Sequence, residues 1–355
     1  MRLHPVGFSH LGQVNADGIR YVWQLRDNAP YIESAAFRAR AKILTSEADR
    51  HISAYTTSVS GGCALTAAKV PCRFCRTGNT LRFSGPLSAR EIALQNVFMV
   101  LSDMEQTGQA AENNPREFAY MGQGEPGYSY PQLREAIRIT DKAMYALGQK
   151  VHRHLLATCG VTEMIDAFMS DLENDYFNGT RVTFHYSLHA ARDRASVMPI
   201  ENIYGYREVI QRLPRLYELT GEKSCVGVLL FKNYRNGISS KGYCTDMKEI
   251  EAIATALDPS VCRISLCEFN PCDSVGANGE ISQAEAAELT SMLEARGFEV
   301  KLFASFGRQE NTACGLLGGT VPDIKTDDHI LARYYRALSV IDAAEAWSFL
   351  RNRPQ

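Results

Sequence analysis

The chain has 355 residues, of which 45% are hydrophobic and 22% are charged, a composition that excludes a disordered, collagen-like or coiled-coil protein. Its 38 basic and 40 acidic residues give a net charge of −2, which is unlike a protein built mainly to hold a nucleic-acid backbone. We find neither an apolar run that could span a bilayer nor a signal-peptide pattern, and we expect a cytoplasmic protein without membrane contact. Thiols are kept reduced in that compartment, so the ten cysteines need a role other than disulfide formation.

The predicted elements begin with a hairpin and continue as a strand–helix alternation. Tyr21–Leu25 and Tyr31–Ala35 lie on either side of Asp27-Asn28, which predicts two antiparallel strands joined by a turn. From about residue 55, alternation of strands and helices predicts a parallel sheet with crossover helices. The predicted strands are Tyr55–Gly61, Glu117–Gly122, Val151–Thr158, Arg181–Leu188, Cys225–Phe231, Cys262–Phe269 and Glu299–Phe303. The predicted helices are Ser88–Gln106, Gln132–Leu147, Val161–Leu172, Tyr206–Leu219, Met247–Leu257 and Gln283–Arg296.

Two of these helices begin with a capping box, in which Ser88 precedes Glu91 and Ser282 precedes Glu285. The alternation favours an α/β fold with a partial (β/α)6 barrel, in which ligands bind at the C-terminal ends of the strands. We expect an N-terminal hairpin extension over residues 1–53, the barrel over 54–327 and a C-terminal helix over 328–355.

Three cysteines lie on one loop directly after the first predicted barrel strand. Cys63 is followed by Cys72 and Cys75, and the last two form a C-x-x-C pair. Three thiolates on one loop suit a soft metal or an iron–sulfur cluster, and three ligands to a four-iron cluster leave one iron open to another ligand. A structural zinc site normally needs a fourth Cys or His at similar spacing, and none follows nearby. A redox pair or buried structural thiols are the alternatives.

The second predicted barrel strand ends in a glycine-rich segment, Met121-Gly122-Gln123-Gly124-Glu125-Pro126. Glycine allows a ligand or another backbone to come close, and a carboxylate can accept hydrogen bonds from an ammonium group. Such a segment alone is weak evidence for a ligand site. Its value lies in its position, one strand–helix unit after the cysteine loop.

Together these motifs resemble the radical S-adenosylmethionine (SAM) superfamily, and within it the family of ribosomal-RNA adenine methyltransferases that includes the chloramphenicol–florfenicol resistance methyltransferases. The resemblance runs from about residue 21 to residue 319. The segments that match in order are Tyr31–Ser34, Ser58–Leu65, Phe74–Gly78, Met121–Pro126, Ala157–Gly160, Tyr186–Ala190, Phe269–Pro271 and Asn311–Leu317.

The resemblance implies a 4Fe–4S cluster and SAM as cofactors, with an external electron donor of the flavodoxin or ferredoxin kind. It implies that Cys63, Cys72 and Cys75 hold the cluster. It also implies SAM contacts, which we assign to Gly124, Glu125, Ser187, His189 and Asn270.

In the resembled enzymes one SAM methylates a protein cysteine, and a radical made from a second SAM takes a hydrogen from that S-methyl group. The resulting carbon radical adds to an sp² carbon of the substrate. Cys314 matches the methyl-carrying cysteine, and Glu33 matches a glutamate assigned as proton acceptor. Without the resemblance, Cys314 would be interpreted as a buried loop residue and Glu33 as ordinary surface.

The sequence departs from the family in three places. The gap between Cys63 and Cys72 is eight residues, five longer than usual, and such an insertion adds little loop-closure entropy. Thr56 stands where the family has a second cysteine that helps to release the product. The chain also begins almost at the hairpin, without the family's N-terminal helical domain and without a basic block. We therefore expect ribosomal RNA to be a doubtful substrate, and a small heterocycle, a peptide or a small RNA to fit better.

The leading hypothesis is a radical SAM methyltransferase that uses Cys314 as methyl carrier. A second hypothesis keeps the cluster and SAM but lets the radical abstract hydrogen directly from the substrate, giving rearrangement, ring closure or cross-linking. A third hypothesis is a non-catalytic iron–sulfur or zinc module. The Gly-Glu-Pro segment and Asn270 would be unnecessary in such a module.

Overall fold

The structure is a computed structural model in which residues 3–13, 16–25, 31–41, 50–107, 115–235, 242–270, 276, 279, 281–303, 317 and 327–351 are described. One sheet has the strand order β1-β2-β3-β4-β7-β8-β9-β10-β11-β12, and β5 and β6 form a second, small sheet. The strands of the large sheet are β1 (Leu3–Gln13), β2 (Ala16–Leu25), β3 (Ile32–Ala41), β4 (Arg50–Thr56), β7 (Arg116–Ala119), β8 (Val151–Thr158), β9 (Val182–Ser187), β10 (Ser224–Leu230), β11 (Cys262–Glu268) and β12 (Val300–Phe303).

The N-terminal strands form an antiparallel unit that is larger than the predicted hairpin. β2 pairs antiparallel with β3, with Tyr21 opposite Ser34, which confirms the hairpin. β1 adds a further antiparallel strand on the other side of β2. β4 pairs antiparallel with β3 and parallel with β7, so the extension and the barrel strands share one hydrogen-bonded sheet.

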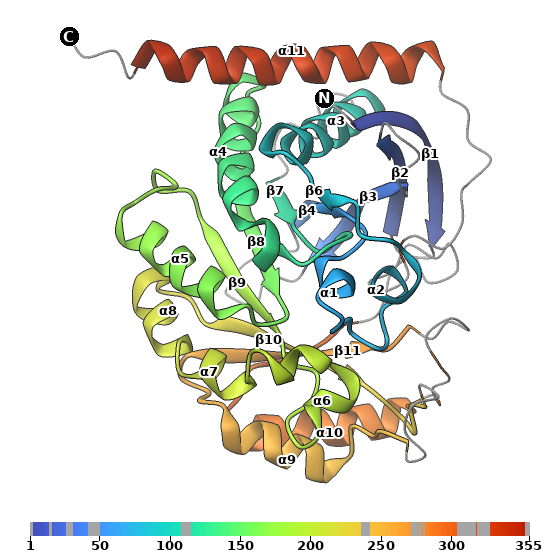
Figure 1. The fold of residues 1–355 in the computed structure, drawn as a ribbon, viewed down its shortest axis with the longest axis vertical. Coiled ribbons are helices and arrows are strands. Elements are labelled where there is room, and N and C mark those ends of the chain that lie inside the picture. The colour runs from blue at the N-terminus through green and yellow to red at the C-terminus, as the bar shows by residue number, and fades with distance from the viewer. Residues whose placement is uncertain are drawn as a thin grey trace.

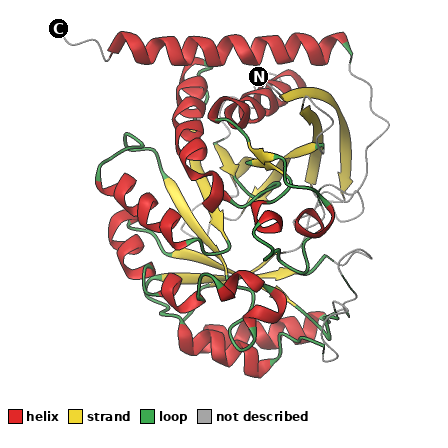
Figure 2. Cartoon of the chain, viewed as in Figure 1, coloured by secondary structure: helices red, strands yellow, loops and turns green. Residues whose placement is uncertain are grey.

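In the large sheet, every neighbouring pair of strands from β4 to β12 is parallel, which confirms the predicted α/β class. Helices connect these strands and cover the sheet (Figures 1 and 2). The longer connecting helices are α3 (Ala89–Thr107), α4 (Tyr130–Ala146), α5 (Thr162–Glu173), α7 (Tyr206–Ile210), α8 (Leu213–Thr220), α9 (Met247–Ala256) and α10 (Gln283–Ala295).

The predicted helix Tyr206–Leu219 is two helices, because the chain leaves the helical ladder between Ile210 and Leu213. Pro214 explains the break, since proline has no N–H to donate to the carbonyl four residues earlier. Both predicted capping boxes are present. Glu285 accepts from the Ser282 backbone N–H at 2.8 Å, and Glu91 accepts from the Ser88 backbone N–H at 2.9 Å.

The C-terminal helix α11 (Asp328–Arg351) lies across α3 and α4 (Figure 1). Charged groups hold it there: Arg333 donates to Glu105 of α3 at 2.9 Å, and Arg90 pairs with Asp342 and Glu345. Because the sheet, α4 and α11 all contact α3, that helix is buried on nearly every side, including at the polar residues Gln95, Asn96 and Asp103. None of the helices in the described ranges is both long and apolar enough to cross a membrane.

Candidate functional site

The cysteine loop lies between β5 (Ser60–Gly61) and β6 (Gly85–Pro86), at the end of the first barrel strand. Cys63 precedes the short helix α1 (Ala64–Ala67), and Cys75 precedes α2 (Arg76–Thr80). The long gap between the first two cysteines is therefore partly folded as α1. The Thr66 hydroxyl of α1 donates to the Gly78 carbonyl of α2 at 2.6 Å, so the two helices brace each other.

Asn79 holds the C-x-x-C part of the loop. Its side-chain amide donates to the carbonyl of Cys72 at 2.8 Å and to that of Cys75 at 2.7 Å. The Cys75 backbone N–H also donates to the Cys72 carbonyl at 3.1 Å. These contacts fix the backbone of both cysteines, although the sequence offered no signal that singled out Asn79.

The three thiols share one buried environment. Cys63 and Cys72 are buried, and Cys75 is half-buried. Burial raises the pKa of the Cys63 thiol, and the charges of Cys75, Cys72 and Glu125 raise it further. In the described part of the chain no three His, Cys, Asp or Glu side chains converge as ligands of a single ion would. Thiolates on separate irons of one cluster are held farther apart than ligands of one ion, so the loop fits a cluster by its donor set and shared burial.

The glycine-rich segment follows β7 and lies against β5, the strand that precedes the cysteine loop. A Cβ on Gly124 would lie 2.3 Å from the Ser60 hydroxyl oxygen, and the backbone there has φ +109°. Both observations require glycine at this position.

Replacing Gly124 with alanine is expected to lower the unfolding free energy by about 3 kcal/mol, because backbone strain and a steric clash add together. Gly148→Ala is the matched control, since Gly148 has φ +68° and an alanine Cβ there would meet no heavy atom within 4 Å. The unfolding free energy of Gly148→Ala should fall by only about 1 kcal/mol, because backbone strain acts there without a steric clash. Urea unfolding of the two variants measures both values, and equal losses would contradict the close approach.

Glu125 is buried, and both of its carboxylate oxygens accept hydrogen bonds from the chain. Oε1 accepts from the Thr158 hydroxyl at 2.5 Å and from the Gly127 N–H at 3.0 Å, while Oε2 accepts from the Cys159 N–H at 2.9 Å. Burial raises the pKa of Glu125, and these three hydrogen bonds oppose the rise. The carboxylate joins the ends of β7 and β8, and it keeps acceptor capacity for a ligand ammonium group.

The end of β9 reaches the cysteine loop through His189. The imidazole of His189 packs edge-on against the Phe74 ring at 5.2 Å, and Phe74 lies between Cys72 and Cys75. Burial and the Arg194 charge lower the pKa of His189 to about 3, so the ring is neutral at pH 7. Its Nδ1 is buried without a hydrogen-bond partner among the described residues. An orphaned buried nitrogen is available to a ligand.

Arg194 holds the ends of β8 and β9 together. This buried side chain donates to the carbonyls of Cys159 at 2.7 Å, Leu188 at 2.9 Å and Ser187 at 3.1 Å, and it pairs with Glu201 at 2.8 Å. Sequence reasoning missed Arg194, because nothing in its local sequence distinguishes it from Arg192. Ser187 therefore ends β9 at a fixed backbone position beside the site.

Asn270 and Glu33, which the sequence assigns to the site, lie at its other edges. Asn270 is buried directly after β11, next to Phe269, whose ring lies 6.4 Å from that of Phe74. Glu33 is buried on β3 and accepts from Arg20 at 2.9 Å. The main-chain carbonyl of Glu33 accepts from the Ser58 hydroxyl at 2.5 Å. The Ser58 hydroxyl oxygen in turn accepts from the Gln123 N–H at 2.8 Å. This chain of bonds connects β3 to the glycine-rich segment.

Cys314 lies outside the described residues, so its role stays a prediction. Leu317, three positions later, is described, and its carbonyl accepts from the Thr77 hydroxyl at 2.9 Å. Thr77 follows Cys75 by two positions. Leu317 is thus hydrogen-bonded to the cysteine loop.

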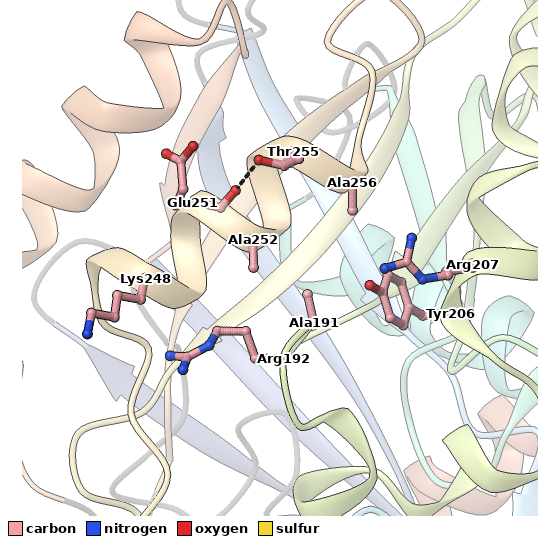
Figure 3. A pocket seen from close by; sticks show the side chains of 9 residues that line it. All are labelled: Ala191, Arg192, Tyr206, Arg207, Lys248, Glu251, Ala252, Thr255 and Ala256. Atoms are coloured by element: carbon pink, nitrogen blue, oxygen red, sulfur yellow. Dashed lines mark hydrogen bonds between the residues drawn. The ribbon is translucent and has the colours of Figure 1, made fainter.

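A pocket of about 520 Å³ lies between α9, the start of α7 and the segment after His189 (Figure 3). Its charged residues include Arg192, Arg207 and Lys248, with Glu251 on the same helix as Lys248. Across the described ranges, Arg207 and Lys248 form no ion pair with a carboxylate. Arg192 lies 3.8 Å from Asp246. The lining residues are Ala191, Arg192, Tyr206, Arg207, Lys248, Glu251, Ala252, Thr255 and Ala256.

Comparison with known proteins supports the resemblance. A protein of Flavobacterium johnsoniae named "Probable dual-specificity RNA methyltransferase RlmN" is 24% identical over 269 residues, which is 74% of this chain and 68% of that protein. Proteins of the same name from Thermosipho melanesiensis and Acidothermus cellulolyticus are 25% and 28% identical over 84% and 85% of this chain, and 75% and 69% of their own lengths. No protein-family model matches the chain.

The fold is shared with a solved protein. The crystal structure of a radical SAM methyltransferase from Sphaerobacter thermophilus superposes with a TM-score of 0.67 at 23% identity, covering 89% of this chain and 81% of that one. At this identity the likeness is one of fold.

One prediction was wrong. We expected ribosomal RNA to be a doubtful substrate, but the relatives are named as RNA methyltransferases, so that doubt is not supported. The physical reason is that neither the three departures from the family pattern nor a net charge summed over a whole chain describes the face that meets the substrate. The relatives bear out the catalytic class and the cofactors predicted from the motifs, which are those of a radical SAM methyltransferase with a 4Fe–4S cluster and SAM.

Proposed function

We propose that this enzyme methylates a carbon atom of RNA, with its cofactors bound at the C-terminal ends of β4, β7, β8, β9 and β11. The observation that carries the site assignment is the contact of His189 with the cysteine loop, together with the three bonds made by the Glu125 carboxylate. These contacts bring strand ends that are far apart in sequence to one place. Cys63, Cys72 and Cys75 would hold the cluster there.

The bound cluster and SAM supply radical chemistry, and the chain supplies positions and hydrogen bonds. Gly124 lets the glycine-rich segment lie close to Ser60 beside the cysteine loop, and Glu125 offers acceptors to an ammonium group. His189, neutral at pH 7, offers one ring nitrogen without a partner in the described chain, while Ser187 and Asn270 offer polar groups at the ends of β9 and β11.

Cys314 would carry the methyl group, and Glu33 would accept a proton. The bond from Thr77 to the Leu317 carbonyl supports the first assignment, because it holds Leu317 at the cysteine loop and Leu317 follows Cys314 by three positions. The Gln123 N–H donates to the Ser58 hydroxyl, which donates to the main-chain carbonyl of Glu33; these bonds support the second assignment, because they join β3 to the glycine-rich segment. Iron-binding thiols also require a reducing compartment, which agrees with the cytosol.

RNA as the substrate rests on the names of the relatives and on the basic pocket of Figure 3. Arg207 and Lys248 lack carboxylate partners among the described residues, so they are available to phosphate groups. Arg192 is the third cation of this pocket and follows His189 by three positions. A backbone phosphate bound there would lie next to the segment that forms the edge of the SAM site.

The test is methyl transfer to RNA by the reconstituted holoenzyme under a chemical reductant, with SAM labelled in its methyl group. Transcripts of ribosomal RNA and of transfer RNA, made without modification, are the probes, and free adenosine is the control. We expect label on a base carbon of at least one transcript and none on adenosine. SAM cleavage without label in either transcript would refute RNA as the substrate.

A further inference from the structure

A fourth cysteine touches one of the three loop cysteines. The Sγ of Cys159, at the end of β8, lies 3.7 Å from the Sγ of Cys72, although the two residues are 87 positions apart. The sequence does not predict this contact, because it depends on how the end of β8 meets the cysteine loop.

Both residues of this pair are held by their backbones. The Cys159 N–H donates to Glu125 at 2.9 Å, and its carbonyl accepts from Arg194 at 2.7 Å. The Cys72 carbonyl accepts from Asn79 at 2.8 Å. With both main chains fixed, rotation of the two side chains is the motion that can bring the sulfurs from contact to bonding distance.

We propose that Cys72 and Cys159 form a reversible disulfide in the cluster-free enzyme, and that this bond prevents the cluster from being rebuilt until it is reduced. The proposal rests on the proposed role of Cys72 as a cluster ligand. It goes further because it gives Cys159 a function in a chain that has no cysteine before Cys63.

The chemistry needs a disulfide oxidant such as glutathione disulfide. One protein thiolate attacks the oxidant, forming a mixed disulfide and releasing one glutathione thiol. The second protein thiolate attacks that mixed disulfide at the protein sulfur and releases the other glutathione. Two protein thiols have then lost two electrons and two protons, and the oxidant has been reduced to two thiols.

The disulfide and the cluster exclude each other, because the Cys72 sulfur cannot bind iron as a thiolate while it is bonded to Cys159. The bond also removes the Cys72 thiolate from the irreversible branch of sulfur oxidation. A bound cluster would in turn protect the Cys72 sulfur from oxidation. Oxidation should therefore capture this pair only when the cluster is absent.

The experiment uses the full chain, stripped of iron by a chelator without oxygen and then treated with glutathione disulfide. Peptide mass spectrometry without reduction should find Cys72 linked to Cys159. Iron and sulfide uptake by the oxidised protein should be at least about tenfold slower than before oxidation, and a thiol reductant should restore it.

Cys159→Ser should form no such link, and oxidation should leave its iron uptake at the unoxidised rate. Cys244→Ser, which removes an exposed thiol elsewhere, is the matched control and should behave as the unaltered protein does. Glutathione left on Cys72 as a mixed disulfide, a link from Cys72 to Cys63 or Cys75, or equal uptake before and after oxidation would each overturn the proposal. Failure of the RNA assay alone would refute the proposed substrate and leave this result standing.

Discussion

Replacing Cys75 with alanine is expected to remove the bound iron and sulfide and to reduce SAM cleavage at least about a hundredfold. Changes in groups that only support metal ligands already lower affinity by about 10- to 100-fold, so loss of one ligand of three should do at least as much. Cys75 sits directly before α2, where Asn79 holds its carbonyl, so the loop backbone should persist in the variant. Iron and sulfide analysis and the yield of 5′-deoxyadenosine measure the two effects.

Cys244→Ala is the control for Cys75→Ala, because Cys244 is an exposed thiol outside the loop. It should keep its iron and its SAM cleavage. If the Cys75 variant kept both as well, the cysteine loop would not be the cluster site. Circular dichroism of both variants separates loss of ligand from loss of fold.

Replacing Cys314 with alanine is expected to separate SAM cleavage from methylation. The cluster ligands and the strand-end residues remain, so 5′-deoxyadenosine should still form. Methyl transfer to RNA should fall at least about a thousandfold, because the group that carries the methyl is gone. Intact-protein mass spectrometry should show one added methyl group in the unaltered enzyme after SAM treatment, and none in the variant.

Methylation of RNA at the ordinary rate by Cys314→Ala would refute the methyl relay. Ala313→Gly is the matched control, because it alters the neighbouring residue and leaves the thiol in place. It should keep the added methyl group and the ordinary rate of RNA methylation.

Elements with a strong local pattern could be predicted from the sequence. The strand Val151–Thr158 has the predicted bounds, and the capping box at Ser282 marks the start of α10. β1 was missed, because His4, Pro5 and Gly7 interrupt its pattern, and its strand geometry comes from pairing with β2. Helix α1 was missed for a similar reason: at four residues it is too short to be stable alone, and its contact with α2 supports it.

In the candidate site, the sequence predicts the parts that follow a local spacing and misses the parts that depend on tertiary contact. The cysteine loop and the glycine-rich segment are local patterns, and both lie at strand ends as expected. Arg194 and the contact between Cys72 and Cys159 depend on which strand ends become neighbours. The error about the substrate came from three departures from the family pattern, supported by a net charge for the whole chain, and none of these describes the surface that meets the substrate.

The measurement that tests the central claim most directly uses SAM with a fully deuterated methyl group and an unmodified RNA transcript. If Cys314 carries the methyl and loses one of its hydrogens before the carbon bond forms, the RNA product should contain a CD2H group. A CD3 group on RNA would mean direct transfer from SAM without the relay. Cleavage of SAM with no deuterium in RNA would contradict the account of this enzyme as a radical RNA methyltransferase.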